Sequence, residues 1–229
     1  MKKQAFILTI ISLIFFIGLI GCEKDEELKE ATLQLKFTTL TSETNLKSVV
    51  ANSTQFTSGY IILEHLEFQT ETDTDSIEMD FEIESYITVD YATGDITPDL
   101  SAIEVVPGIY TELELEFELW DQTDQPSIYL EGTWTDANST SHPILLNMPL
   151  GQSFSLEMEG EFTIQENSSM TAYITIDPNA WFLGEAGELL PSATVNEEGI
   201  IVISPEQNST IYDIIKDAID RTSEIEIEM

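Results

Sequence analysis

The chain has a single cysteine, two histidines and only eight lysine and arginine residues among its 229 residues. One cysteine cannot form a disulfide within its own chain, so a disulfide-stapled scaffold is excluded. The few basic residues oppose 43 acidic ones, which gives a formal net charge of −35 at pH 7. A chain without a basic stripe cannot neutralise phosphates, so nucleic-acid binding is excluded as well.

Basic residues are missing altogether from residues 48–215. The carboxylates of this stretch cannot pair with cations of the same stretch, so most of them must be solvated or neutralised by external ions. With 42% apolar residues, the composition is that of a globular protein rather than of a disordered acidic tail. The length suits one domain with short additions.

The sequence also lacks the usual catalytic signatures. His65 and His142 are far apart, and there is no zinc-spaced Cys/His cluster, no Ser-His-Asp set and no glycine-rich phosphate loop. A glycosidase needs only two carboxylates, but its acid must be buried to raise the pKa, whereas the glutamates here alternate onto the wet faces of predicted strands. The sequence therefore favours a non-enzymatic protein, with a carboxylate-only glycosidase as the remote alternative.

The N-terminal segment has the layout of a secretory signal. Lys2 and Lys3 precede an apolar stretch over residues 5–21, and charge resumes at Glu23. Leu19-Ile20-Gly21-Cys22 resembles the lipobox of bacterial lipoproteins, and this resemblance implies cleavage before Cys22 and attachment of acyl chains such as palmitate to it. We predict a signal peptide over residues 1–21 and lipidation at Cys22, the only cysteine.

The residues after Cys22 indicate where the protein is sent. Glu-Lys-Asp-Glu-Glu, residues 23–27, resembles the acidic export tag of surface lipoproteins in a Gram-negative phylum of polysaccharide degraders. This resemblance implies a position in the outer membrane, lipid-anchored and facing the exterior. Several acyl chains on one cysteine are enough for stable anchoring. Residues 22–30 would then form an acidic tether between membrane and domain.

Strict alternation of apolar and acidic residues dominates the next part of the chain. Residues 112–119 read Glu-Leu-Glu-Leu-Glu-Phe-Glu-Leu, which is typical of a β-strand with one wet face. The same period recurs around residues 33–37, 81–89, 154–164 and 170–176, with turn-like clusters between the runs. We predict an all-β fold, an antiparallel β-sandwich of seven to ten strands over residues 31–207. Residues 40–58 are expected to form a long loop or an irregular edge.

One segment near the C-terminus has helical rather than strand spacing, behind Asn208 and Ser209, which can cap a first turn. The helically spaced residues are Ile211, Ile214, Ile215, Ala218 and Ile219. We predict a short amphipathic helix followed by an acidic tail over residues 208–229. The helix could plug an open end of the sandwich or dock on a partner.

Three acid-rich turns are candidates for calcium binding, because hard cations take several carboxylate and carbonyl oxygens from flexible loops. Glu71, Asp73 and Asp75 fall in one turn, Asp95 and Asp99 in a second, and Asp121 and Asp124 in a third. None of the turns has the pattern of an EF-hand loop, and the alternative is that all are simply solvated turn tips. No other cofactor is expected.

Two aromatic residues are candidates for ligand contact. Trp120 follows Glu114, Glu116 and Glu118 on the wet face of its strand, and the strand parity also puts Tyr86 on an acidic face. Exposed aromatic rings among carboxylates can stack on sugar rings while the acids accept hydroxyl protons. The alternative is that both rings pack inward or under a loop.

Residues 59–182 resemble a family of lipoprotein domains of unknown function. The likeness is carried by residues 59–68, by Pro-Gly-Ile-Tyr-Thr-Glu-Leu at 107–113 and by Ile-Thr-Ile-Asp at 174–177. It implies a sandwich related in shape to transthyretin-like and carbohydrate-binding domains, without established catalytic residues. We expect a lipid-anchored surface module that binds a glycan, a protein or a divalent cation. The alternative is a structural or adhesin subunit that assembles through edge strands or the C-terminal helix.

Overall fold

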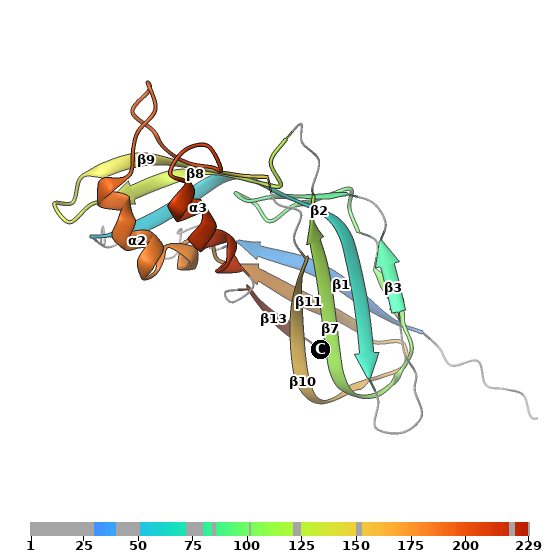
Figure 1. Ribbon diagram of the computed structural model, residues 1–229. Coiled ribbons are helices and arrows are strands. Elements are labelled where there is room, and N and C mark those ends of the chain that lie inside the picture. Colours follow the sequence, from blue (N-terminus) through green and yellow to red (C-terminus); the bar gives the residue numbers. More distant parts are fainter. Residues whose placement is uncertain are drawn as a thin grey trace, which may run out of the picture.

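The computed structural model describes residues 30–39, 51–71, 80–83, 86–100, 102–120, 125–149, 153–219 and 223–228. Within them the chain is all-β, with two sheets and a few short helices late in the sequence (Figure 1). The predicted all-β sandwich-like fold is therefore confirmed, although thirteen strands replace the predicted seven to ten. The predicted signal peptide and Cys22 lie outside the described residues.

The smaller sheet has four strands in the order β13-β11-β1-β6. Their bounds are β1 Ala31–Thr39, β6 Ile103–Val105, β11 Ser169–Ile176 and β13 Ser223–Glu228. The central pair, β1 and β11, is parallel, while β6 and β13 are antiparallel to their neighbours. The sandwich is thus not purely antiparallel, because strands distant in sequence meet at its centre.

The larger sheet has nine strands, and its main path runs β10-β7-β2-β8-β9-β12. The bounds along this path are β2 Ser53–Glu71, β7 Gly108–Leu119, β8 Ile128–Thr135, β9 Ser141–Met148, β10 Ser153–Ile164 and β12 Ile201–Ile203. The remaining strands are β3 Asp80–Ile83, β4 Ile87–Asp90 and β5 Ile96–Thr97. All pairs in this sheet are antiparallel except β9 with β12.

The 19-residue strand β2 is the central strand of the larger sheet. Its C-terminal half pairs with β7 and its N-terminal half with β8. Ile62 lies at the junction, where it accepts a hydrogen bond from the Trp120 amide and donates one to the Ser127 carbonyl. The N–H and C=O of one strand residue point to the same side, so β7 and β8 lie one after the other along one edge of β2. The shorter strands β3 and β4 pair along the other edge.

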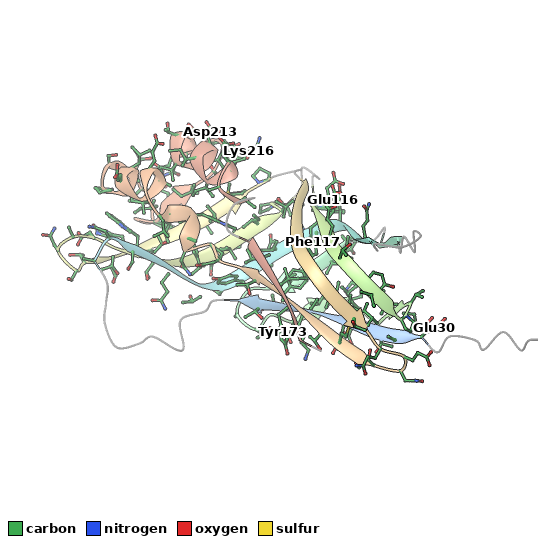
Figure 2. All side chains as sticks on the ribbon, turned by 90° about the horizontal axis from the view of Figure 1, so that it is seen from below. Glu30, Glu116, Phe117, Tyr173, Asp213 and Lys216 are labelled. Carbon is green, nitrogen blue, oxygen red and sulfur yellow. The ribbon has the colours of Figure 1, made fainter. Side chains whose placement is uncertain are left out.

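The core lies between the two sheets. In β1, the apolar residues Leu33, Leu35 and Phe37 are buried while the residues between them are not, as expected for a strand with one face inward. Phe37 meets Phe117 of β7 edge to face, with ring centroids 5.8 Å apart. Figure 2 shows Phe117 among the side chains that fill the space between the sheets. Burial of such rings is the main term that holds the two layers together.

Short helices cover the end of the large sheet that is formed by β8, β9 and β12 (Figure 1). They are η3 Ala180–Phe182, α2 Glu185–Leu189, η4 Leu190–Ser192 and α3 Ser209–Lys216. Trp181 and Phe182 of η3 are buried, and the Phe182 ring lies 5.7 Å from that of Phe56 in β2. In α3, the predicted amphipathic helix, Ile211, Tyr212 and Ile215 are buried, so most of its apolar face is used within the chain.

Three details of the sequence interpretation differ from the structure. Residues 53–58, expected in a loop or irregular edge, form the start of the central strand β2. Residues 223–228, assigned to an acidic tail, form the edge strand β13. Asn208 does not cap α3 through its side chain. It adopts φ 56°, and its side chain instead accepts from the Thr194 amide and donates to the Val202 carbonyl.

Acidic residues face acidic residues in the register of the large sheet. Glu112 of β7 is paired with Glu159 of β10 on one side and with Glu71 of β2 on the other. Glu116 is likewise paired with Glu67 of β2. Like charges directly opposite each other are destabilising. The sheet therefore forms because its other face is apolar, against a repulsion that dissolved ions must screen.

Candidate functional site

The structure brings Tyr86 and Trp120 together, although 33 residues separate them in the sequence. Trp120 directly follows β7, and its amide donates to the Ile62 carbonyl of β2. Tyr86 directly precedes β4, whose first residue Ile87 is paired with Leu63 of β2. The two residues thus flank β2 from opposite edges. Their rings meet edge to face across it, with centroids 5.3 Å apart and an interplanar angle of 66°.

The two rings lie on the outer face of the large sheet, away from the core. Ile61 and Leu63 point into the core, so Ile62 between them points outward. Ile62 is nevertheless only 2% exposed. Trp120 lies beside Ile62 in the sheet, and the Tyr86 ring extends toward Trp120 from the other edge of β2. We infer that the aromatic rings cover Ile62 and form a small apolar patch on the outer face.

The two rings differ in accessibility. Tyr86 is 58% exposed, as expected for a ligand-contacting ring, whereas Trp120 is half-buried. The Trp120 Nε1–H is shielded from solvent and has no hydrogen-bond partner among the described residues. A buried donor without an acceptor is costly. Glu118, two residues before Trp120, and Glu64, two residues after Ile62, are also half-buried, and each follows the alternation of its strand onto the same outer face.

The predicted calcium residues are largely outside the described part of the chain. Asp73, Asp75, Asp121 and Asp124 are not described, and Glu71 is placed only by its backbone, as the last residue of β2. Within the ranges that the structure describes, no group of three or more His, Cys, Asp or Glu side chains could hold a metal ion. Calcium binding at these turns stays a prediction.

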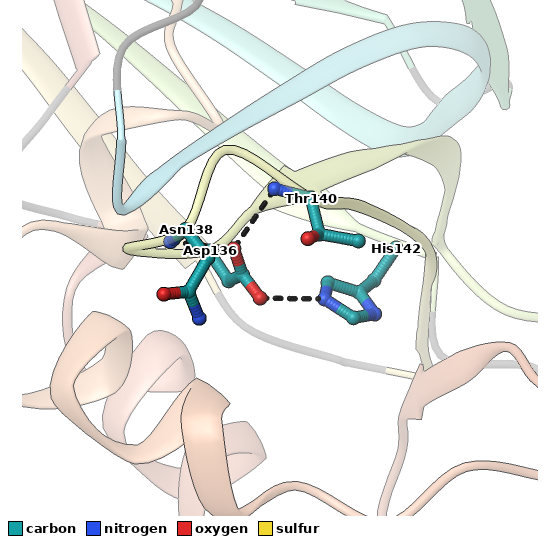
Figure 3. Close-up of polar contacts among 4 residues, drawn as sticks. All are labelled: Asp136, Asn138, Thr140 and His142. Atoms are coloured by element: carbon teal, nitrogen blue, oxygen red, sulfur yellow. Dashed lines mark hydrogen bonds and ion pairs between the residues drawn. The ribbon is translucent and has the colours of Figure 1, made fainter.

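A polar turn joins β8 to β9 at the far end of the sheet (Figure 3). The Asp136 carboxylate accepts hydrogen bonds from the amides of Asn138 and Thr140, both at 2.8 Å. Its other oxygen lies 3.2 Å from His142 Nε2. The His142 ring in turn stacks on the buried ring of Trp134, with centroids 5.0 Å apart. No role was assigned to His142 from the sequence, and its pairing with Asp136 was not predicted.

The Asp136–His142 pair has part of the arrangement of a catalytic base. The amide of Thr140, and then the His142 ring, lower the pKa of Asp136 below its usual range. A nucleophile would still have to contact the ring. We find no Ser, Thr or Cys side chain hydrogen-bonded to His142 in the described part of the chain. The pair therefore stabilises the hairpin turn, because it satisfies backbone donors that the strands leave unpaired.

We expect Asp136→Asn to destabilise the protein in a pH-dependent way. The folded-state pKa of Asp136 is depressed, so its ionised form adds stability above the unfolded-state pKa of about 3.9, and this stability is lost as the pH falls through the folded-state value. The melting temperature of the variant should lie below that of the wild type near about pH 7, and the two should converge toward about pH 2. A difference that does not change with pH would contradict this.

Two further aromatic residues on the outer face were missed by the sequence analysis. Tyr60 of β2 is paired with Tyr129 of β8, and their rings stack at 5.5 Å with an interplanar angle of 16°. Each residue alternates with core residues of its own strand, which was visible in the sequence. Their pairing was not, because it depends on the register of β2 with β8.

Comparisons with protein-family models, with curated proteins and with solved structures find no match for this chain. Among the described residues, no helix is long and apolar enough to cross a membrane.

Proposed function

We propose that the protein is a non-enzymatic β-sandwich module, displayed on the outer membrane by a lipid on Cys22, that binds a glycan through Tyr86 and Trp120. The observation that carries the proposal is the contact of these two rings on the outer face of the sheet, in strands that also carry the half-buried Glu64 and Glu118. The C–H face of a sugar stacks on an aromatic ring, and its hydroxyls donate to carboxylates.

The burial of the acidic residues supports a binding function over hydrolysis. A glycosidase acid needs a desolvated carboxyl with a raised pKa. Among the Asp and Glu residues whose side chains the structure describes, none is fully buried, since the buried polar residues there are Thr54, Ser127, Thr135 and Ser204. The carboxylates near the aromatic pair are therefore suited to accept hydrogen bonds from a ligand rather than to protonate it.

The alternative, a structural or adhesin subunit, has less support from helix α3. Its residues Ile211, Tyr212 and Ile215 are buried within the chain, so a partner could reach mainly its polar side. Among the described strands, β13 and β6 end the small sheet and β10 ends the large one, so assembly through edge strands stays open as an alternative. A partner would add a strand there.

The glycan proposal is tested by affinity gel electrophoresis of the ectodomain against soluble neutral polysaccharides: a β-1,4-glucan derivative, a β-1,3-glucan, xylan and galactomannan. We expect at least one of them to retard the wild type. Trp120→Ala and Tyr86→Ala should each weaken that binding by about tenfold or more, a loss of about 1.4 kcal/mol.

The matched control is Tyr173→Ala. Tyr173 is a half-buried aromatic residue on the outer face of the small sheet, where it contacts Lys36, and its loss should leave glycan binding unchanged. Melting temperatures of all variants confirm folding. The proposal fails if no neutral polysaccharide retards the wild type, or if Trp120→Ala binds as well as the wild type does.

A further inference from the structure

A second aromatic pair lies on the same sheet as the first. Tyr60 and Tyr129 are both half-buried, with parallel rings. The Tyr129 hydroxyl donates to one oxygen of Glu131 at 3.3 Å, and the Ser58 hydroxyl approaches the other at 3.4 Å. Burial, followed by the charge of Glu131, raises the pKa of the Tyr129 hydroxyl, so this hydroxyl stays a hydrogen-bond donor. Two hydroxyl groups thus already bind this carboxylate.

Both aromatic pairs lie on the same face of the sheet. Ile61 of β2 and Ile128 and Leu130 of β8 belong to the core, so Tyr60 and Tyr129, which alternate with them, point outward. Ile62 also points outward, next to Trp120. Moving along β2, the outer face therefore presents first the Tyr60–Tyr129 pair and then the Tyr86–Trp120 pair. We call these four aromatic residues together with Ile62 the outer aromatic strip.

The strip is longer than one sugar ring. Tyr60 precedes Ile62 by two residues and Glu64, the neighbour of Tyr86, by four. At about 3.3 Å per strand residue, the two pairs are about 7–13 Å apart along β2. Ile62 lies between them on the outer face of β2 and is covered, being only 2% exposed, so no polar residue of β2 separates the two pairs on that face. A ligand that used both pairs would have to be a chain of several units.

The charges around the strip restrict what this chain can be. Glu131 accepts from Tyr129, Asp90 is paired with Tyr60, and Glu64 and Glu118 lie two residues along their strands from Ile62 and Trp120. Residues 48–215 contain no Lys or Arg. A glycan that carried carboxylate or sulfate groups would be repelled. A neutral glycan offers hydroxyl donors to these carboxylates, as Ser58 and Tyr129 already do at Glu131.

We propose that the outer aromatic strip binds a linear, neutral polysaccharide that runs along β2, with Tyr86–Trp120 as one subsite and Tyr60–Tyr129 as a second. This inference rests on the proposed glycan-binding function and adds to it the length and charge of the ligand. The first subsite binds the ligand by itself, and the second subsite adds contacts only to ligands that are long enough to reach it. Its removal should therefore affect long ligands much more than short ones.

The test measures, by isothermal titration calorimetry, the affinity for oligosaccharides of increasing length, prepared from the neutral polysaccharide that retards the ectodomain most strongly. For the wild type we expect affinity to rise with length until the second subsite is filled. Tyr129→Ala should bind the shortest ligands like the wild type but lose the gain with length, about tenfold. Trp120→Ala should weaken binding at every length.

Tyr129→Phe is the matched control, because it keeps the ring and removes only the hydroxyl. It should retain most of the gain with length, and it keeps the test decisive if Tyr129→Ala does not fold. Alginate and chondroitin sulfate, as anionic polymers, should not bind.

Different failures point to different errors. A wild-type affinity that does not depend on length, or a Tyr129→Ala variant with the full gain, overturns the second subsite and leaves the proposed function intact. Preference for alginate over neutral chains overturns the charge argument. A wild type that binds poly-lysine and no neutral polysaccharide overturns both proposals, and the strip would then be a docking surface for a basic protein.

Discussion

Gly59→Ala is expected to lower the free energy of unfolding by more than about 4 kcal/mol, a loss that few single substitutions cause. Gly59 has φ 126°, and a Cβ atom there would lie 2.0 Å from the Tyr129 carbonyl oxygen and 2.8 Å from Leu130 Cα. Both contacts are with backbone, which cannot move without breaking the pairing of β2 with β8. The substitution is therefore expected to disrupt the pairing of β2 with β8 at the end of the sheet that the short helices cover.

Gly199→Ala is the matched control for this prediction. Gly199 also has a positive φ, 80°, but a Cβ atom there would meet nothing within 4 Å. Its replacement should cost only the backbone strain, about 1–2 kcal/mol. Urea denaturation followed by circular dichroism gives both values. Equal effects of the two substitutions would show that the close approach of β8 to Gly59 is not what requires a glycine.

Phe117→Ala should destabilise the protein by about 3–5 kcal/mol, since it removes a fully buried ring from a packed core. Phe117 is 0% exposed and meets Phe37 of the opposite sheet. The substitution therefore opens a cavity between the two layers of the sandwich. Chemical denaturation of the variant measures the loss.

Two further variants locate the effect of Phe117 at the contact between the sheets. Ile109 lies in the same strand but is 57% exposed, so Ile109→Ala should change stability by no more than about 0.5 kcal/mol. A double-mutant cycle with Phe37→Ala should show a coupling of about 0.5–1.5 kcal/mol between the two rings. Additive effects of Phe37→Ala and Phe117→Ala would mean that this contact does not join the layers.

The strands with one wet face could be predicted from the sequence because their apolar residues alternate with polar ones. The run at residues 112–119 and that at 170–176 both fall inside observed strands, β7 and β11. In such strands the sequence pattern alone indicates which face is buried. Core burial and the local pattern then agree, which is why these elements were recognised without any knowledge of their neighbours.

Of the two strand segments that were missed, one has a weak pattern and the other a clear one. Residues 53–58 read Ser-Thr-Gln-Phe-Thr-Ser, with one large apolar residue, and a bulge between Phe56 and Ser58 interrupts the alternation. Their strand state comes from pairing with β8, not from local preference. Residues 223–228 do alternate, with Ile225 and Ile227 between glutamates, and could have been recognised. Their position beside β11 could not.

The candidate site shows the same limit. Parity put Tyr86 and Trp120 on acidic faces, but their contact depends on which strands flank β2 and in what register. The same holds for Tyr60 with Tyr129 and for Asp136 with the stacked His142. The failed prediction for Asn208 has a local cause, since its left-handed backbone directs the amide toward Thr194 and Val202 instead of the first turn of α3.

The glutamates of two edge strands also bear on how neighbouring copies of the protein interact. The edge strand β10 carries Glu157, Glu159 and Glu161 at alternate positions, and the edge strand β13 carries Glu224, Glu226 and Glu228. If two copies paired edge to edge, carboxylates would be brought beside carboxylates. Sheet edges are otherwise templates for aggregation. If the proposed lipid on Cys22 confines many copies to one plane, the same kind of repulsion that weakens the large sheet would keep neighbouring molecules separate.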